Sequence, residues 1–300
     1  MEPGIPCIVT GVMDKWKAMR AWRLEKFQND PRIKEGVYIG QREEMIPLRV
    51  YYDYIKNHAH KNKSKWMVFM PDVFDLYPSL SQDYTVPDFF SEDDDFMTKV
   101  DEDLRLDWRW IIMAPKKSGS GWHVDPANTT RWLALVTGAK LWGLYPPSQY
   151  HIPGVKNNYY QKRDYEMDDA YNWWVYTRPH LFSKQPLECV QKAREMMFIP
   201  SGWWHSVVNL DDTVAVTQNF CNKYSFKSCL KELKEQADSD GLFIGKTFEQ
   251  LRDLYSNQYQ GYFDKDDMNF HAPETGIGKT AHEIKEKRIE KLKEILSGKY

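Results

Sequence analysis

The 300-residue chain is poor in cysteine and has no long hydrophobic run. Its four cysteines are widely spaced, and none belongs to a Cys-x-x-Cys pair: Cys7, Cys189, Cys221 and Cys229. This usage is typical of reduced structural cysteines in an intracellular protein. No segment approaches the roughly 20 consecutive apolar residues that cross a bilayer, and the first residues lack the charged and apolar regions of a signal peptide. We therefore expect no membrane partner.

The chain also lacks an excess of positive charge. Its formal net charge is −2, which argues against direct DNA binding, because nucleic-acid binders normally carry a basic surface. Acidic residues gather in two runs. The longer run lies between residues 91 and 107 (Glu92, Asp93, Asp94, Asp95, Asp101, Glu102, Asp103 and Asp107), and the shorter holds Asp164, Glu166, Asp168 and Asp169. Each run is interpreted either as a solvated loop or as an acidic lip that attracts a basic substrate.

Short strand-like segments dominate the middle of the chain. A strand is predicted at 5–10 and helices at 16–27 and 51–58, followed by an apolar run at 66–70. Further strands are predicted at 108–113, 131–136, 140–145, 195–199, 205–210 and 213–220. Turn sequences rich in Gly, Pro, Ser and Asp separate these segments. Many short strands at this spacing indicate an antiparallel sandwich or a jelly-roll barrel.

The pattern changes to helix at about residue 226. Leucines and phenylalanines recur there at helical spacing in two amphipathic stretches. The last 22 residues form a charged segment with scattered Ile and Leu, which predicts a surface or partner-binding helix. We therefore divide the chain into a jelly-roll-like β domain with N-terminal helical and strand elements at 1–225 and a C-terminal helical region at 226–300. The C-terminal helices are a candidate surface for a homodimer.

A candidate metal site lies in the segment Gly-Trp-His-Val-Asp-Pro at 121–126. Side chains two residues apart on a strand project to the same face, so His123 and Asp125 can hold one ion. His205 opens a later predicted strand. Two histidines and one carboxylate on one side of a metal leave other positions open, which suits non-haem Fe(II) and O₂ chemistry. A His-x-Asp pair alone is weak evidence, so the hypothesis depends on the accompanying residues.

Two further strands carry polar residues on faces that are expected to be internal. Lys140 shares a strand face with Trp142 and Leu144, where a buried lysine needs an anion; alternatively, its amine reaches solvent at the strand end. In the strand at 213–220, one face carries the small or polar side chains Thr213, Ala215, Thr217 and Asn219. That face predicts a ligand-holding cavity, or else the solvent face of an edge strand.

Three sequence blocks extend this pattern: SGSGWHVDP at 118–126, the stretch at 132–142 with Leu-Val-Thr-Gly-Ala-Lys at 135–140, and FIPSGWWHSVVNLDDTVAVTQNF at 198–220. Together they resemble the jumonji-C family of 2-oxoglutarate oxygenases, particularly the subgroup of the phosphatidylserine-receptor-like arginine demethylase and lysyl hydroxylase. The resemblance covers about residues 5–225. It implies a mainly β fold with flanking helices around a double-stranded β-helix (jelly-roll, cupin-like) core. It also implies Fe(II), the co-substrate 2-oxoglutarate, and O₂.

Carried over by position, the resemblance assigns iron to the triad of His123, Asp125 and His205. It assigns the far carboxylate of 2-oxoglutarate to Lys140 and Thr217. It also assigns co-substrate or pocket positions to Ser120, where the subgroup has threonine, and to Asn219. Two departures remove polar contacts near the co-substrate: Met67 stands where the subgroup has tyrosine, and Leu133 where it has asparagine.

The resemblance favours a protein hydroxylase that acts on lysine side chains of basic proteins or peptides. An N-methyl demethylase for arginine or lysine, on histones or other basic proteins, uses the same residues and stays open. A third hypothesis is a jumonji-fold binding module without activity, which the complete triad and Lys140 disfavour. The resemblance also implies that a nuclear location is favoured over a cytoplasmic one.

Overall fold

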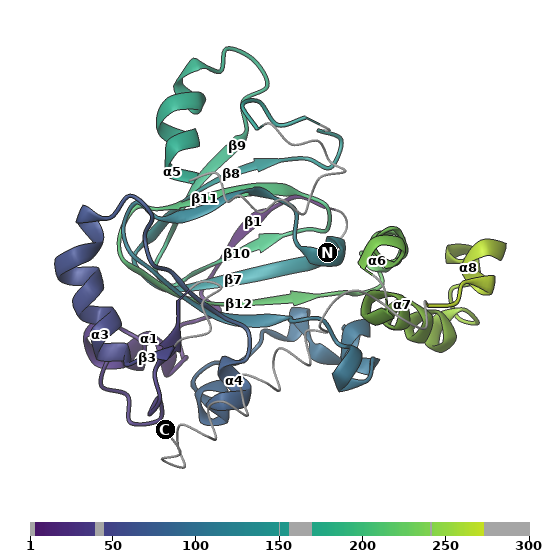
Figure 1. The fold of residues 1–300 in the computed structure, drawn as a ribbon, viewed down its shortest axis with the longest axis horizontal. Coiled ribbons are helices and arrows are strands. Elements are labelled where there is room, and N and C mark those ends of the chain that lie inside the picture. Colours follow the sequence, from purple (N-terminus) through teal and green to yellow (C-terminus); the bar gives the residue numbers. More distant parts are fainter. Residues whose placement is uncertain (1–3, 40–44, 150, 156–169, 241, 273–300) are drawn as a thin grey trace.

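Two antiparallel sheets face each other in the computed structural model, which describes residues 4–39, 45–149, 151–155, 170–240 and 242–272 (Figure 1). The larger sheet has the order β1 (Cys7–Thr10), β10 (Glu195–Ile199), β7 (Thr130–Thr137), β12 (Thr213–Phe220), β5 (Arg109–Ala114), β4 (Val68–Met70). The smaller has the order β6 (Gly119–His123), β11 (Trp204–Asn209), β8 (Ala139–Tyr145), β9 (Leu187–Lys192). The strands β2 (Val37–Tyr38) and β3 (Met45–Ile46) pair with each other in a separate two-stranded sheet.

Successive side chains of each strand point to opposite faces of the sheet, because a β-strand has a two-residue repeat. On β7, Leu133 and Leu135 point between the two sheets and join an apolar cluster that also contains Trp142 of β8. Trp132 and Val136 of β7 face outward into a second cluster with the N-terminal segments. The predicted mainly β, jelly-roll class is therefore confirmed.

Short helices cover the outer face of the larger sheet: α1 (Ala18–Ala21), α2 (Leu24–Phe27), α3 (Leu48–Asp53) and α4 (Val73–Leu76). The single helix predicted at 16–27 is wrong, because the chain is extended at Arg23 and forms two helices. The buried indole of Trp22 donates to Asp83 at 2.8 Å. This long-range contact overrides the local helical pattern. The predicted helix at 51–58 is confirmed by α3 and the π-helical turn Tyr54–His58 that follows it.

Strands β2, β3 and β9 were not predicted. In β6, the segment rich in glycine and serine was interpreted as a turn, and only the His123 end was expected to be a strand. β6 pairs with β11, and a Cβ atom added at Gly119 would lie 1.9 Å from the carbonyl oxygen of Val207. Glycine is required there because the backbones approach so closely. No helix in the part of the chain that the structure describes is long and apolar enough to cross a membrane.

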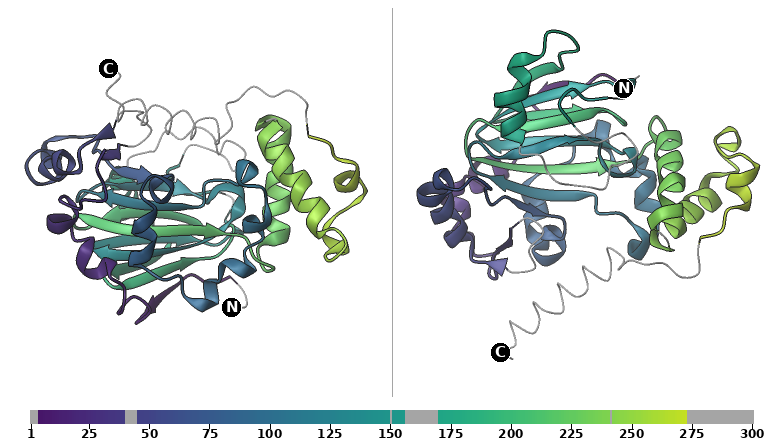
Figure 2. Two further views of the ribbon diagram at one scale, coloured as in Figure 1. Left: turned by 90° about the horizontal axis from the view of Figure 1, so that it is seen from below. Right: turned by 45° about the horizontal axis from the view of Figure 1, so that its top comes forward.

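The C-terminal helices α6 (Phe226–Asp240), α7 (Leu242–Tyr255) and α8 (Lys265–Asn269) lie beside one end of the sheets, away from α1 and α3 (Figure 2). Their apolar faces form a separate cluster with Phe226, Leu233 and Leu251, and this cluster also includes Ala127 from the loop after β6. The helix predicted for the last 22 residues lies outside the described residues.

We expect Leu233→Ala to destabilise the protein by roughly 2–5 kcal/mol, because it removes a fully buried side chain from this cluster. Urea unfolding measures the change. Leu254→Ala, at a 49% exposed position on the neighbouring helix, is the control and should change stability little. Equal losses in both variants would show that Leu233 has no special packing role.

Candidate metal centre

The two histidines of the predicted triad meet across a strand pair. His123 ends β6 and His205 lies near the start of β11, directly opposite it in the antiparallel register. Their ring centroids are 4.1 Å apart. Side chains of directly opposed residues lie on the same face of a sheet. Strand pairing therefore places two imidazoles, 82 positions apart in the chain numbering, beside each other.

Asp125 joins them from a loop and not from the strand, which corrects the expected strand alternation of His123 and Asp125. β6 ends at His123, and Asp125 precedes the short 3-10 turn Pro126–Asn128. Ala127 and Asn128 in this turn have positive φ angles of 51° and 50°. One ligand atom from each of the three side chains lies within 4.8 Å of the others. This spacing fits three ligands of a single ion, at metal–ligand distances of about 2 Å.

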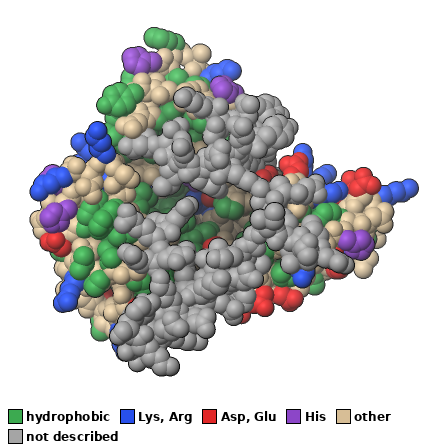
Figure 3. All heavy atoms as spheres, viewed as in Figure 1, with side chains coloured by type: hydrophobic (Ala, Val, Ile, Leu, Met, Phe, Trp, Pro, Cys, Tyr) green, Lys and Arg blue, Asp and Glu red, His purple; other side chains and the backbone are tan. Residues whose placement is uncertain are grey.

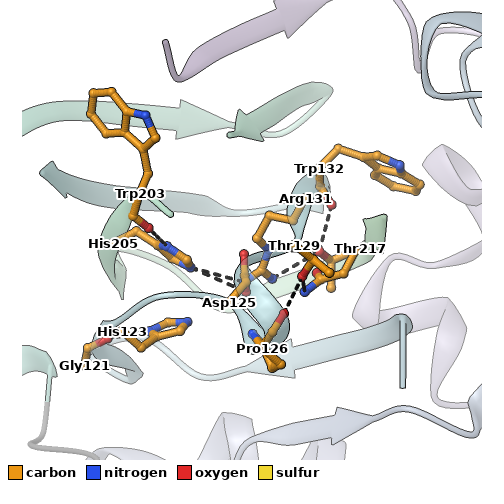
Figure 4. Close-up of polar contacts among 11 residues, drawn as sticks. Gly121, His123, Asp125, Pro126, Thr129, Arg131, Trp132, Trp203, His205 and Thr217 are labelled. Atoms are coloured by element: carbon orange, nitrogen blue, oxygen red, sulfur yellow. Dashed lines mark hydrogen bonds and ion pairs between the residues drawn. The ribbon is translucent and has the colours of Figure 1, made fainter. Parts of the chain in front are cut away.

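Backbone carbonyls orient both imidazoles toward this point. The Nδ1 atom of His123 lies 2.7 Å from the carbonyl oxygen of Gly121, and that of His205 lies 3.1 Å from the carbonyl oxygen of Trp203. The rings point toward Asp125 in Figure 4, and this places the Nε2 atom of His205 3.8 Å from Asp125 Oδ1. Such outer hydrogen bonds fix the tautomer that binds a metal.

Electrostatics keep the triad in its metal-binding protonation state. Burial lowers the pKa of His205 to about 3, with the nearby His123 adding to the effect, and burial also lowers the pKa of His123. Burial alone would raise the pKa of Asp125, but the positive charge of Arg131, followed by the two histidines, lowers it overall. Two neutral imidazoles and one carboxylate are thus present at neutral pH, the form required for metal binding.

The C-terminal helices hold the loop that carries Asp125. Asn128 donates from Nδ2 to the Glu232 carboxylate of α6 at 3.1 Å, and the Cys229 thiol lies 3.6 Å from the Asn128 carbonyl oxygen. The hydroxyl of Thr129 donates to the Pro126 carbonyl at 2.8 Å. All four cysteines of the chain are free thiols, so packing and hydrogen bonds hold this loop.

Lys140 is buried inside the barrel, which excludes the alternative of an amine in solvent. The residue is 2% exposed. Its Nζ donates to Asn209 Oδ1 at 2.6 Å and to Thr213 Oγ1 at 3.4 Å. Burial, and then the charge of Arg131, lowers the pKa of Lys140 to about 7. Both contacts are with neutral groups, so the amine stands ready for an anionic partner.

The predicted polar face of β12 is buried and points into the barrel. Thr217 donates to the Trp132 carbonyl at 2.7 Å, and Asn219 donates to Thr129 Oγ1 at 3.0 Å. The side chain of Asn219 also helps to lower the pKa of the Asp125 carboxyl. The cavity interpretation of this face is therefore favoured over the solvent-edge alternative, since every residue of β12 is buried.

Ser120 reaches the same interior face through a β-bulge. β6 is irregular opposite Ser206, so Ser120 opposes Val207 while His123 opposes His205. A bulge lets residues three apart share one side of a sheet. Of the two departures noted above, Leu133 lies in the interior apolar cluster, and Met67 immediately precedes β4.

Arg131 is a site residue that the sequence reasoning missed. Its guanidinium lies between Asp125 and Thr217, with Nη1 3.0 Å from Asp125 Oδ1 (Figure 4). The signal was available: Arg131 precedes Leu133 and Leu135 at intervals of two on an apolar strand, which places an arginine on the interior face. The same reasoning had identified Lys140.

Comparison with known proteins places this centre in a family. A model of the cupin-like domain matches residues 1–226. The chain is 36% identical over 232 residues to "Bifunctional arginine demethylase and lysyl-hydroxylase psr-1" of Caenorhabditis elegans, covering 74% of this chain and 56% of that protein. It is 34% identical over 225 residues to "Lysine-specific demethylase JMJ21" of Arabidopsis thaliana, covering 74% and 24%. It is 32% identical over 244 residues to "2-oxoglutarate and iron-dependent oxygenase JMJD4" of Gallus gallus, covering 73% and 56%.

The chain therefore belongs to the cupin-like family, and its jumonji-C resemblance is confirmed. It spans about a quarter of the length of JMJ21 and just over half of the length of the other two relatives. The names of these relatives describe arginine or lysine demethylation, lysyl hydroxylation, or oxygenation that depends on iron and 2-oxoglutarate.

Proposed function

We propose that this chain is an Fe(II)- and 2-oxoglutarate-dependent oxygenase that hydroxylates lysine side chains of basic proteins. The observation that carries the proposal is a buried His–Asp–His triad in the same barrel interior as a buried lysine bonded to neutral groups. The triad supplies the metal ligands, and the lysine supplies a charge for a carboxylate. Burial of the charged groups of the triad and of Lys140 costs free energy. Their presence therefore disfavours a binding module without activity.

Each residue has a defined task in this function. His123, Asp125 and His205 hold the iron, which when bound with 2-oxoglutarate and O₂ supplies the oxidation of a C–H bond. Lys140 binds the far carboxylate of the co-substrate, and Thr217, which contacts Arg131, lines its site together with Ser120 and Asn219. Trp142 and Trp110 belong to the apolar interior that keeps water from the reacting groups. The protein contributes position and a dry environment to the chemistry of the metal.

N-methyl demethylation is the second candidate, and the names of psr-1 and of the Arabidopsis relative JMJ21 favour it. Hydroxylation of an N-methyl group leads to its loss, so the same centre serves both reactions. The two differ in where the target carbon lies relative to the metal. Incubation of the Fe(II)-loaded protein with lysine, methyl-lysine and methyl-arginine peptides tests both by mass spectrometry. Gain of one oxygen supports hydroxylation, loss of a methyl group supports demethylation, and unchanged peptides with unconsumed 2-oxoglutarate contradict the proposal.

A basic substrate is supported by the position of the longer acidic run. Phe96 of this run donates its backbone N–H to the Cys221 carbonyl, just after β12, and Met97 packs in the same cluster as Ala127 of the metal loop. Asp95 is a structural exception: it is buried and accepts from the backbone N–H groups of Met97 and Cys221. Most other acids of the run are exposed.

Most acidic side chains visible in Figure 3 lie on the half of the molecule that carries α6, α7 and α8. Acidic groups at the metal end of the barrel would raise the local concentration of a Lys- or Arg-rich peptide. The shorter acidic run, at 164–169, lies outside the described residues, so its role stays a prediction. A homodimer through the C-terminal helices and a nuclear location also stay predictions.

Met67→Tyr should tighten 2-oxoglutarate binding by a few-fold, the effect of one added hydrogen bond of about 0.5–1.5 kcal/mol. Val68 packs outward, so Met67 lies on the inward-facing side of the same extended segment. In the sheet, Val68 is paired with Met113 of β5. The next residue of β5, Ala114, is paired with Thr213, which contacts Lys140. The residue before Val68, Met67, is therefore on the Lys140 side of β4. Calorimetric titration of the Mn(II)-loaded variant measures the change. Met67→Phe, which lacks the hydroxyl, is the matched control, and equal affinity of the two variants contradicts the prediction.

A further inference from the structure

Arg131 is a charged side chain in an apolar interior, and its contacts join the metal centre to the inward face of β12. Its side chain is 7% exposed. Nη1 donates to Asp125 Oδ1 at 3.0 Å and lies 3.4 Å from His205 Nε2. Nε and Nη2 lie 3.3 Å and 3.1 Å from Thr217 Oγ1 (Figure 4). The guanidinium therefore lies beside the position that a metal ion would take.

These contacts satisfy the guanidinium only partly once a metal is present. The group carries five N–H donors in a planar fork, and Thr217 accepts from two of its nitrogens through a single hydroxyl. Among the residues that the structure describes, its one carboxylate partner is Asp125, which is also a candidate metal ligand. A divalent ion bound to Asp125 would weaken the attraction between this carboxylate and Arg131. A second anion next to the metal would then neutralise the positive charge of Arg131.

The charges inside the barrel define which anion fits. Arg131, protonated Lys140 and a divalent ion together outweigh the carboxylate of Asp125, and both histidines are neutral. Arg131 and Lys140 influence each other electrostatically across the interior. Their hydroxyl partners, Thr217 and Thr213, stand four residues apart on the same face of β12. A dianion with a carboxylate at each end matches two separated cations and the charge excess.

We propose that Arg131 binds the metal-proximal carboxylate of 2-oxoglutarate, so that the co-substrate is held between two side-chain cations, Arg131 beside the metal and Lys140 deeper in the barrel. This inference rests on the proposed function, because it takes the co-substrate from it. Arg131 is in this view a residue that determines co-substrate affinity in this chain. It also offsets the polar contact that Leu133, two residues later on the same face, cannot provide.

The test separates the two ends of the co-substrate. Mn(II)-loaded protein is titrated calorimetrically with 2-oxoglutarate and with 2-oxobutyrate, which has the metal-proximal carboxylate and keto group but no far carboxylate. We expect Arg131→Met to weaken both ligands by the same factor, at least about 30-fold. Lys140→Met should weaken 2-oxoglutarate alone. Arg131→Lys should recover part of the affinity, and Arg194→Met, at an exposed arginine, is the matched control.

Mn(II) affinity, measured from the spectroscopic signal of the free ion, gives a readout apart from ligand binding and activity. We expect it to stay constant or to rise in Arg131→Met, because a positive charge beside the ion is removed. Unchanged affinity for both keto acids in Arg131→Met overturns the inference and leaves the proposed function intact. Weakening of 2-oxoglutarate alone also overturns it, since Arg131 would then act at the far end. A wild-type protein that binds Mn(II) but no 2-oxoglutarate overturns both proposals.

Discussion

His205→Ala is expected to abolish turnover of 2-oxoglutarate and to reduce the affinity for Fe(II) or Mn(II) by at least about 100-fold, more than the loss of an outer contact of a metal site costs. His205 is fully buried and supplies one of three converging ligand atoms. With it removed, His123 and Asp125 alone must hold the ion. Metal content after dialysis and release of CO₂ from labelled 2-oxoglutarate measure the two losses.

The choice of residue matters for this experiment. Asp125→Ala should also abolish binding, but it leaves the Arg131 guanidinium buried without its carboxylate, a loss that typically costs about 3–5 kcal/mol of stability. His205→Ala removes a neutral group and separates metal loss from unfolding more cleanly. His180→Ala, at an exposed histidine, is the control. Full metal content and full decarboxylation in His205→Ala would show that the triad is assigned wrongly.

Lys140→Met should raise the dissociation constant for 2-oxoglutarate by the equivalent of about 2–5 kcal/mol, the usual cost of losing one partner of a buried charged contact. The metal affinity should change far less, because Lys140 contacts Asn209 and Thr213 and none of the triad. Calorimetry on the Mn(II)-loaded protein measures both values. Lys192→Met, at an exposed lysine of the adjacent strand β9, is the matched control.

The same residue should give co-substrate binding a characteristic pH dependence. Burial and the charge of Arg131 lower the pKa of Lys140 to about 7, and only the protonated amine attracts a carboxylate. Affinity should therefore be greatest below this value and fall as the pH rises through it. The pKa of His205, lowered by burial to about 3, keeps that metal ligand neutral over this range. Lys140→Arg should remove the dependence, because a guanidinium stays protonated. A flat profile in the wild type contradicts the assignment.

Interpretation of the sequence succeeded where a local pattern has one structural outcome. Alternation of apolar and polar residues at 140–145 and 213–220 identified two strands, and the jumonji-C resemblance then placed Lys140 and Thr217 inside the barrel. The resemblance of three blocks to the jumonji-C family supplied the connection between segments far apart in the chain. The strand pairing of His123 with His205 confirms that these segments meet.

The remaining features depended on contacts between distant segments. The glycine-rich part of β6 was interpreted as a turn, yet Gly119 is a strand residue because the backbone of β11 approaches too closely for a side chain. The bulge that turns Ser120 inward also arises from this pairing. The helix expected at 16–27 breaks at Arg23, where the tertiary contact of Trp22 with Asp83 prevails.

The sequence by itself determined the β class of this protein, because strand periodicity is a local property, and the jumonji-C resemblance of its motifs supplied the three metal-ligand candidates and the inward-facing lysine. Only the tertiary structure decided that Asp125 reaches the ion from a loop held by α6, and that Arg131 lies between Asp125 and Thr217. The strand pattern was sufficient to place Arg131 on the inward face, although this signal was missed. Which groups it meets there depends on the packing of two sheets, and that packing is set by long-range contacts.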